Sequence, residues 1–329
     1  MIPINKSQGY LQAFSNQLEI YLYEELTQAI KNKQVVTPKN NKLIVSIEDN
    51  KDIKCLEYLK DNIKKIIQAD IKEQINFIKY LESNCQEISK KYGTKEKKPP
   101  LYQAVKYIFV NRGYESKIST TVKNSIAYKF VEKLDLKTCP YCNRNYISYI
   151  EISDGNTKKT RPQLDHFYPK TIYPFLACSF YNLIPSCTTC NHIKSDDDSF
   201  NDKLINPYEI QENDFIFSYT LNNLDVLEKK YLNYNDEHSI DIIFNKKINS
   251  NEEYFQLETL YQNHKDIVLE LIIKKQYYPT SYINDLSKLG FSKDEIYRYI
   301  FSNYVKTEDL HKRPLSKLIK DISEELKLI

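Results

Sequence analysis

The stretch that decides the fold begins at Cys139–Cys142 (CPYC) and closes at Cys187–Cys190 (CTTC), two C-x-x-C pairs with 44 residues between them. Four thiolates are the ligand set of a closed, tetrahedral structural zinc site. The gap is longer than in a simple zinc ribbon, so it must hold a folded unit whose two ends the metal joins. The alternative is two unrelated knuckles or buried thiols. We favour one structural zinc ion, bound by Cys139, Cys142, Cys187 and Cys190.

The three other cysteines, Cys55, Cys85 and Cys178, stand alone among Ile, Leu and Phe residues. The first residues, MIPINK, lack the basic-then-apolar pattern of a secretory signal, and no apolar run approaches the ~18 to 20 residues that span a bilayer. We therefore expect a cytoplasmic chain that makes no use of a membrane. Disulfides are rare in that compartment, so the three single cysteines are expected to be small core residues.

The composition is that of a globular protein long enough for two ordinary domains or one elaborated domain. Hydrophobic residues make up 41% and charged residues 28% of the 329 residues. A formal net charge of +3 is too small to indicate nucleic-acid binding by itself. The five glycines never lie close together, which excludes a P-loop and a dinucleotide-binding fingerprint. If nucleotide hydrolysis belongs to this system, another chain performs it.

Apolar periodicity predicts helices on both sides of the cysteine pairs. Leu11 to Ala29 and Leu56 to Leu81 repeat at helical spacing, with a short β-like run at Leu43 to Ile47 between them. Residues 90–100 (KKYGTKEKKPP) read as a charged loop, and a further helical pattern covers Tyr102 to Leu136. After the second pair come β-like runs at 215–219 and 240–244, and then helix again.

We therefore predict an α+β, mostly α-helical fold with a central zinc-stabilised module. The expected regions are a helical N-terminal region over 1–130, the module over 131–207 and a mostly helical C-terminal region over 208–329. Between Lys137 and Ser195 there are seven Lys or Arg residues (137, 144, 158, 159, 161, 170 and 194) and three acids (151, 154 and 165), a local charge of 7 − 3 = +4. Such local concentration suits phosphate contacts, which supply most of the affinity for DNA.

Three polar motifs follow one another inside and just after the gap. They are RPQLDHFYPK at 161–170, FYNLIPS at 180–186 and CNHIKS at 190–195. Their order resembles the HNH (ββα-metal) endonuclease superfamily, which has an Asp-His at the end of a strand, an Asn in the following loop and an Asn or His after the last cysteine. The intervals of 16 residues from His166 to Asn182 and of 9 from Asn182 to Asn191 are close to those of that family.

The resemblance implies a DNA endonuclease with one catalytic Mg²⁺ or Mn²⁺ ion. It assigns His166 as general base, Asp165 and Asn191 as metal ligands and Asn182 as the residue that orients His166. His192 is the alternative third ligand. The residue types suit these roles, since neutral imidazole accepts a proton near pH 7 and carboxylate and amide oxygens are hard ligands for Mg²⁺. Asp165 and His166, adjacent on a strand, are expected to point to different sides.

Three basic residues are candidates for nucleic-acid contact. If a helix begins just after Cys190, Lys194 shares a face with Asn191 and can reach a phosphate near the metal. Lys194 can equally be a solvated charge. Arg144 and Arg161 flank the module, and for both the alternatives are phosphate contacts or surface salt bridges.

Two further strings, TCPYCNRNY at 138–146 and HKRPLSKL at 311–318, are similar to those in a group of bacterial HNH proteins. That group includes the nuclease subunit of Septu-type anti-phage systems. The resemblance implies double-stranded, possibly phage, DNA as substrate and an ABC/SMC-like ATPase as partner subunit. The absence of a P-loop in this sequence agrees with an ATPase supplied by another chain. Two rival functions stay open: an inactive zinc-ribbon protein that binds nucleic acid or acts as a scaffold, and an HNH nuclease that acts on RNA.

Overall fold

The structure is a computed structural model of the whole chain, and it describes residues 1–5, 8–120, 125–150, 160–223, 232–246, 249–278 and 280–328. The chain groups into two compact units. The N-terminal unit consists of Lys6–Asp135 with Ser148–Tyr208, and the C-terminal unit of Met1–Asn5, Leu136–Ile147 and Glu209–Ile329. Four of the charges counted above, at positions 151, 154, 158 and 159, lie outside the described residues.

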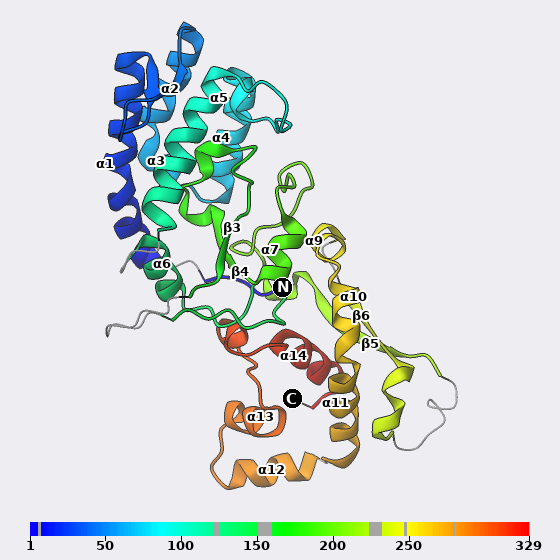
Figure 1. Cartoon of the computed structure of the whole chain (residues 1–329). Coiled ribbons are helices and arrows are strands. Elements are labelled where there is room, and N and C mark those ends of the chain that lie inside the picture. The colour runs from blue at the N-terminus through cyan, green and yellow to red at the C-terminus, as the bar shows by residue number, and fades with distance from the viewer. Residues whose placement is uncertain are drawn as a thin grey trace. The chain divides into compact units, whose positions relative to one another are not determined.

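The N-terminal unit is a group of helices that carries two small antiparallel sheets (Figure 1). Its elements in chain order are α1 (Gln8–Asn32), β1 (Gln34–Val36), β2 (Leu43–Ser46), α2 (Asn50–Asp61), α3 (Ile63–Gln68), α4 (Ile71–Asn84), α5 (Pro100–Val105), the π-helix η2 (Lys106–Ile118), α6 (Ile126–Leu134), β3 (Gln163–His166), β4 (Leu183–Ser186) and α7 (Thr188–Lys194). β1 pairs with β2 and β3 with β4.

Helix α1 packs against several other helices of this unit. Its apolar residues recur every three or four positions and therefore lie on one face. The resulting stripe is buried, and it packs against α2, α3 and η2; it consists of Phe14, Leu18, Leu22, Leu26 and Ala29. The ring of Phe14 also meets Phe180 edge-on, with centroids 5.2 Å apart, and Phe130 of α6 at 5.8 Å. Since Phe180 belongs to the segment between β3 and β4, the helices of this unit directly support that segment.

Three further contacts attach the β3–β4 segment to the surrounding helices. Ser179 Oγ donates to the carbonyl of Ile66 in α3 at 2.6 Å, and Tyr102 of α5 donates its hydroxyl to Thr171 O at 2.7 Å. The thiol of Cys178 donates to the carbonyl of Phe109 in η2 at 3.2 Å. Because hydrogen bonds from three helices restrain this segment, the side chains that it carries are held in position.

The packing of η2 against the β3–β4 segment depends on Gly113. A Cβ atom at this position would lie 2.6 Å from Cys178 Sγ, closer than real Cβ contacts allow, and 3.1 Å from a methyl group of Leu22, which is a tight contact. Gly113 therefore allows η2 and the β3–β4 segment to approach each other closely, although glycine is a poor helix former.

The C-terminal unit is built around the β5–β6 pair (Figure 1). Its elements are β5 (Ile216–Leu221), β6 (Ile240–Lys246), α9 (Asn249–Tyr254), α10 (Leu257–Tyr261), α11 (Lys265–Tyr277), α12 (Thr280–Lys288), α13 (Lys293–Phe301) and α14 (Ser316–Glu325). Asp321 of α14 accepts from Phe217 N of β5 at 2.9 Å and from the buried Lys317 ammonium at 2.5 Å. The bond from Phe217 joins α14 to the sheet, and the ion pair with Lys317 lies within α14.

The predicted fold class is confirmed: the described residues are mostly helical and include three two-stranded antiparallel sheets. The β-like runs at 43–47, 215–219 and 240–244 correspond to β2, β5 and β6. The second helical pattern is three helices, α2, α3 and α4, rather than one. α4 starts afresh because Asp70 and Glu73 form a capping box at its first turn.

The prediction that Cys55 and Cys85 stand alone is wrong. They form a disulfide between α2 and the end of α4, with their Cα atoms 6.1 Å apart. Both are buried, as expected of core residues, but their pairing depends on how two helices pack and has no signature in the spacing of the cysteines. Cys178 is a buried thiol, as predicted.

None of the helices in the described part of the chain has both the length and the apolar content needed to cross a membrane.

Candidate functional site

The four paired cysteines come together. All are buried thiols, and their sulfur atoms lie within 4.8 Å of one another. At the first pair the amide of Arg144 donates to Cys142 Sγ at 3.4 Å, and at the second the amide of Cys190 donates to Cys187 Sγ at 3.5 Å. Amide donors of this kind favour the thiolate form that binds metal. Four buried sulfur ligands in one cluster can hold a metal ion such as Zn²⁺.

The CPYC turn is built by hydrogen bonds within the C-terminal unit. Ile2 N donates to Pro140 O at 2.9 Å, and Tyr261 donates its hydroxyl to Cys142 O at 2.6 Å. Asn143, buried in a left-handed conformation after the turn, donates to Leu310 O at 3.1 Å and accepts from Lys317 N at 3.1 Å. The strings TCPYCNRNY and HKRPLSKL, far apart in sequence, therefore contact each other.

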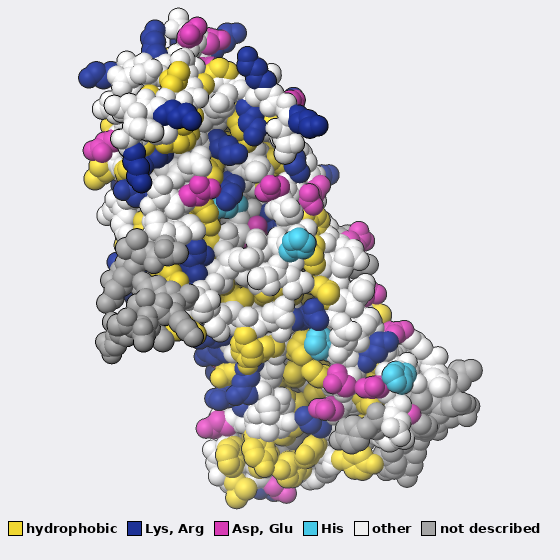
Figure 2. All heavy atoms as spheres, in the orientation of Figure 1, with side chains coloured by type: hydrophobic (Ala, Val, Ile, Leu, Met, Phe, Trp, Pro, Cys, Tyr) yellow, Lys and Arg dark blue, Asp and Glu magenta, His cyan; other side chains and the backbone are white. Residues whose placement is uncertain are grey.

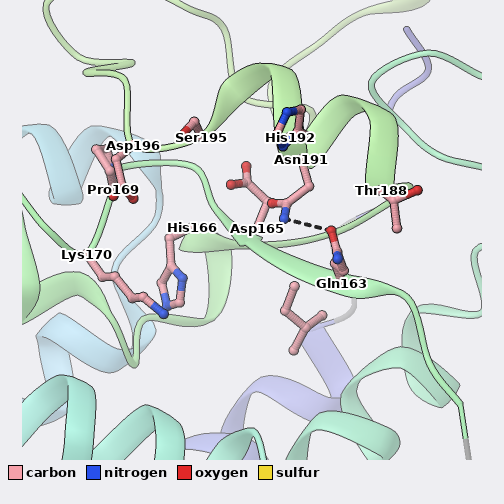
Figure 3. Close-up of a pocket in the computed structure, with 11 residues that line it drawn as sticks. Gln163, Asp165, His166, Pro169, Lys170, Thr188, Asn191, His192, Ser195 and Asp196 are labelled. Carbon is pink, nitrogen blue, oxygen red and sulfur yellow. Dashed lines mark hydrogen bonds between the residues drawn. The ribbon is translucent and has the colours of Figure 1, made fainter.

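The second site is a pocket of about 520 Å³ between β3 and α7 in the N-terminal unit (Figure 3). β3 pairs with β4 so that Asp165 lies opposite Ile184 and His166 opposite Leu183. α7 follows β4 directly, with Cys187 as its N-cap residue, so it begins before Cys190 and not after it as the sequence reading supposed. β3, the segment after it and α7 thus line the pocket, and β4 connects the paired strand to the helix.

His166 is buried at the base of the pocket and is held in one orientation. Its Nε2 lies 3.1 Å from Ala177 O, and the Tyr114 ring packs against it in a T-shaped arrangement with centroids 4.3 Å apart. Burial, reinforced by the charge of Lys170, lowers the pKa of His166 to about 3. A neutral imidazole beside a carbonyl must carry its proton on Nε2, so Nδ1 holds the lone pair and can accept a proton.

Asn182 is completely buried and fixes the segment that follows β3. Its side-chain oxygen accepts from Tyr168 N at 2.7 Å, and its amide donates to Tyr168 O and Leu176 O at 3.1 and 3.0 Å. None of these hydrogen bonds reaches the His166 ring. Its bond to Leu176 lies next to Ala177, whose carbonyl holds that ring, so any influence on His166 passes through the backbone.

Lys194 lies inside the molecule. Its side chain is 0% exposed, and its ammonium donates to His166 O at 2.8 Å and to Asp165 Oδ1 at 3.4 Å. It is on α7 at i+3 from Asn191, but in this structure its ammonium faces the protein interior rather than a ligand. Its contacts join α7 to β3, so Lys194 stabilises the packing of these two elements.

Asp165 and Asn191 meet at the centre of the pocket. Figure 3 shows the Asp165 carboxylate next to the Asn191 amide. The amide nitrogen of Asn191 donates to Gln163 Oε1 at 2.7 Å, which leaves the amide oxygen as the atom available to a metal ion. His192 also lines the pocket and is exposed. The pocket therefore brings a carboxylate and an amide oxygen together beside the neutral His166.

Arg144 and Arg161 lie outside this pocket. Arg144 donates to His264 Nε2 at 3.1 Å, and Arg161 donates to Ser119 Oγ at 2.8 Å and Pro162 O at 3.0 Å. Among the described residues neither forms an ion pair, so the structure shows neither of the alternatives expected for them.

Sequence analysis missed two residues that line the pocket, Gln163 and Lys170, and one that contacts the His166 ring, Tyr114. Gln163 had a signal, because it is two residues before Asp165 on one strand and so shares its face. Lys170 also had a signal in the sequence, since it follows Pro169 in the motif at 161–170. Tyr114 comes from η2, some fifty residues earlier, and had none.

Comparison with known proteins gives one relative. The chain is 38% identical over 69 residues to the Septu protein PtuB of Bacillus thuringiensis. The matched residues are 20% of this chain and 27% of PtuB, so the chain spans about a quarter of the length of the relative. No family model matches the chain, and no solved structure does.

Proposed function

We propose that this chain is a metal-dependent HNH endonuclease that hydrolyses phosphodiester bonds in DNA. The observation that carries the proposal is the pocket between β3 and α7, where a neutral His166 lies beside the Asp165 carboxylate and the Asn191 amide. Proton acceptor and hard oxygen ligands in one pocket are what metal-assisted phosphodiester hydrolysis requires.

In the proposed reaction the chain's own residues activate water and hold the ion. Nδ1 of His166 accepts the proton of a water molecule, whose oxygen attacks phosphorus while the bond to the leaving oxygen breaks. The Nε2–H···O=C bond to Ala177 fixes the ring and leaves Nδ1 as the proton acceptor. Asp165 and Asn191 would bind Mg²⁺ or Mn²⁺, with His192 as the alternative ligand. The ion, when bound, neutralises charge that develops on the phosphate.

The four cysteines have a structural role in this proposal. Zn²⁺ bound by them would stabilise a nuclease module over residues 131–207, with the regions 1–130 and 208–329 as its flanks. Support comes from the buried four-sulfur cluster and from Cys187, which is both a member of the cluster and the N-cap of the helix that carries Asn191.

We also propose that the protein acts in bacterial anti-phage defence together with an ATPase subunit. The similarity to a Septu protein supports the first part. The strings at 138–146 and 311–318, which carry the resemblance to Septu-type proteins, contact each other. This contact further supports a role in anti-phage defence. This sequence has no P-loop, so the ATPase subunit would be another chain.

The test is incubation of the purified protein with plasmid DNA and Mg²⁺ or Mn²⁺, with and without EDTA. We expect metal-dependent cleavage that His166→Ala lowers by at least ~10²-fold, since general-base catalysis contributes about 10² to 10⁴. His238→Ala is the matched control, because this histidine is 89% exposed and outside the pocket, and it should cut at the wild-type rate. A parallel reaction with RNA of equal length decides between the two nucleic acids.

One observation favours the rival function of a zinc-stabilised binding protein. The buried Lys194 ammonium already neutralises Asp165, as a metal ion otherwise would. A protein that binds DNA but cuts neither nucleic acid with either metal would establish the rival and refute the nuclease proposal.

A further inference from the structure

Lys170 is the cation that lies in the pocket with His166. It follows Pro169 in the segment after β3, lines the same pocket wall and is half-buried. Its ammonium lies 4.9 Å from the centroid of the Tyr114 ring, and that ring meets His166 edge-on at 4.3 Å. Figure 3 shows Lys170 extended toward the His166 imidazole. One aromatic ring thus positions both side chains.

The charge of Lys170 is not balanced nearby. Among the residues that the structure describes, no carboxylate lies within salt-bridge distance of its ammonium. Of the two carboxylates of the pocket, Asp165 is paired with Lys194, and Asp196 is exposed at the rim. Among the described residues, the pocket therefore has a cation that contacts an aromatic ring and forms no salt bridge.

Two more lysines add to the positive potential beside it. Lys106, at the start of η2, is half-buried, and burial together with the charges of Lys98 and Lys170 lowers its pKa. Glu115 and Asp196 oppose this shift without reversing it. Lys98 and Lys170 each repel Lys106 in the unbound protein, and a bound anion would offset that repulsion.

We propose that Lys170, supported by Lys106 and Lys98, binds a backbone phosphate of the nucleic acid beside His166. This inference rests on the proposed function. It assigns to Lys170 the phosphate contact that the sequence predicted for Lys194. The buried Lys194 already donates to His166 O and Asp165. Lys170, half-buried in the pocket wall, is open to a ligand. The ammonium is a point charge that requires no particular base, so the contact fixes position and not sequence.

The experiment measures the affinity of the full chain for a fluorescently labelled DNA duplex at several salt concentrations, in EDTA so that cleavage does not interfere. Each phosphate contact contributes about 0.9 to the slope of log K against log salt. We expect Lys170→Gln to weaken binding and to reduce that slope by about 1, whereas Lys170→Arg keeps both near wild type. Lys72→Gln is the matched control, because Lys72 is exposed on α4 and does not line the pocket.

The outcomes separate this inference from the proposed function. Equal affinity and slope for Lys170→Gln and the wild type would overturn the inference, and so would a wild-type chain that does not bind DNA. A loss of binding in both Lys170→Gln and Lys170→Arg would also overturn it, because charge would then not be what matters. If the expected changes occur and the wild type still cuts nothing with Mg²⁺ or Mn²⁺, the phosphate contact stands and the nuclease proposal falls.

Discussion

The imidazole of His166 connects the chemistry of the pocket to its stability. Its pKa is lowered to about 3 by burial in the folded protein, whereas a histidine in an unfolded chain has a pKa of about 6.5. Above pH 6.5 neither state binds the proton. Below pH 6.5 the unfolded chain binds it and the folded protein does not, so the free energy of unfolding falls as the pH decreases.

We therefore predict a loss of about 2 kcal/mol of stability from this residue between pH 6.5 and pH 5, at about 1.4 kcal/mol per unit. Urea unfolding of the wild type and of His166→Gln at both pH values measures it. The variant has no titrating group at this position, so its stability should depend less on pH. Equal pH dependence in the two proteins would show that His166 can be protonated in the folded state.

At the residue scale, the sequence predicted which side chains gather but not what each one contacts. Asp165, His166 and Asn191 were identified because they belong to short motifs, and two of them are neighbours in the chain. The environment of Lys194 could not be predicted, since lysine is almost never fully buried unless it is paired. Its partners, the Asp165 carboxylate and the His166 carbonyl, are brought to it only when α7 packs on β3.

At the scale of elements, the approach of η2 to the β3–β4 segment is the contact most sensitive to a single atom. In Gly113→Ala the added Cβ would lie 2.6 Å from Cys178 Sγ, so either η2 or Cys178 must shift. Overpacking of this kind costs about 1 to 3 kcal/mol, which should outweigh the helix-propensity gain of up to about 1 kcal/mol. Thermal unfolding should show a lower Tm.

Two controls isolate the steric cause. Gly9 of α1 has no atom within 4 Å of a Cβ, so Gly9→Ala should be neutral or stabilising. In a Cys178→Ala background the sulfur is gone, and Gly113→Ala should then cost less than in the wild type, as a double-mutant cycle would measure. Additive costs in the cycle would mean that the contact with Cys178 is not responsible.

The elements themselves were largely predictable, because periodicity is local information. The stripe of α1 and the runs that became β2, β5 and β6 required only the nearest neighbours in sequence. The disulfide between Cys55 and Cys85 was not predictable, because it depends on the packing of α2 beside the end of α4. The support of the pocket by η2 has the same origin, since Tyr114 and Gly113 reach it only through the tertiary fold.

At the scale of the whole molecule, the four cysteines are the feature whose loss should have the widest effect. Structural zinc sites contribute about 10 to 16 kcal/mol of apparent binding free energy in small zinc-finger peptides, which is comparable to the total stability of a typical domain. Cys187 belongs to the cluster and also caps the helix that carries Asn191 and Lys194. Loss of this residue would therefore affect both the proposed metal centre and the pocket.

We predict one zinc ion per chain in the purified wild type and less than one in Cys187→Ser, with unfolding of at least the module over 131–207. Elemental analysis measures the metal, and hydrogen exchange of α7 measures the local loss of structure. Cys178→Ala is the matched control: Cys178 is also a buried thiol, burial raises its pKa, and it lies outside the cluster, so this variant should keep its zinc. A folded wild type that contains no zinc, or a Cys187→Ser variant that retains a full equivalent, would contradict the assignment of these sulfurs as zinc ligands.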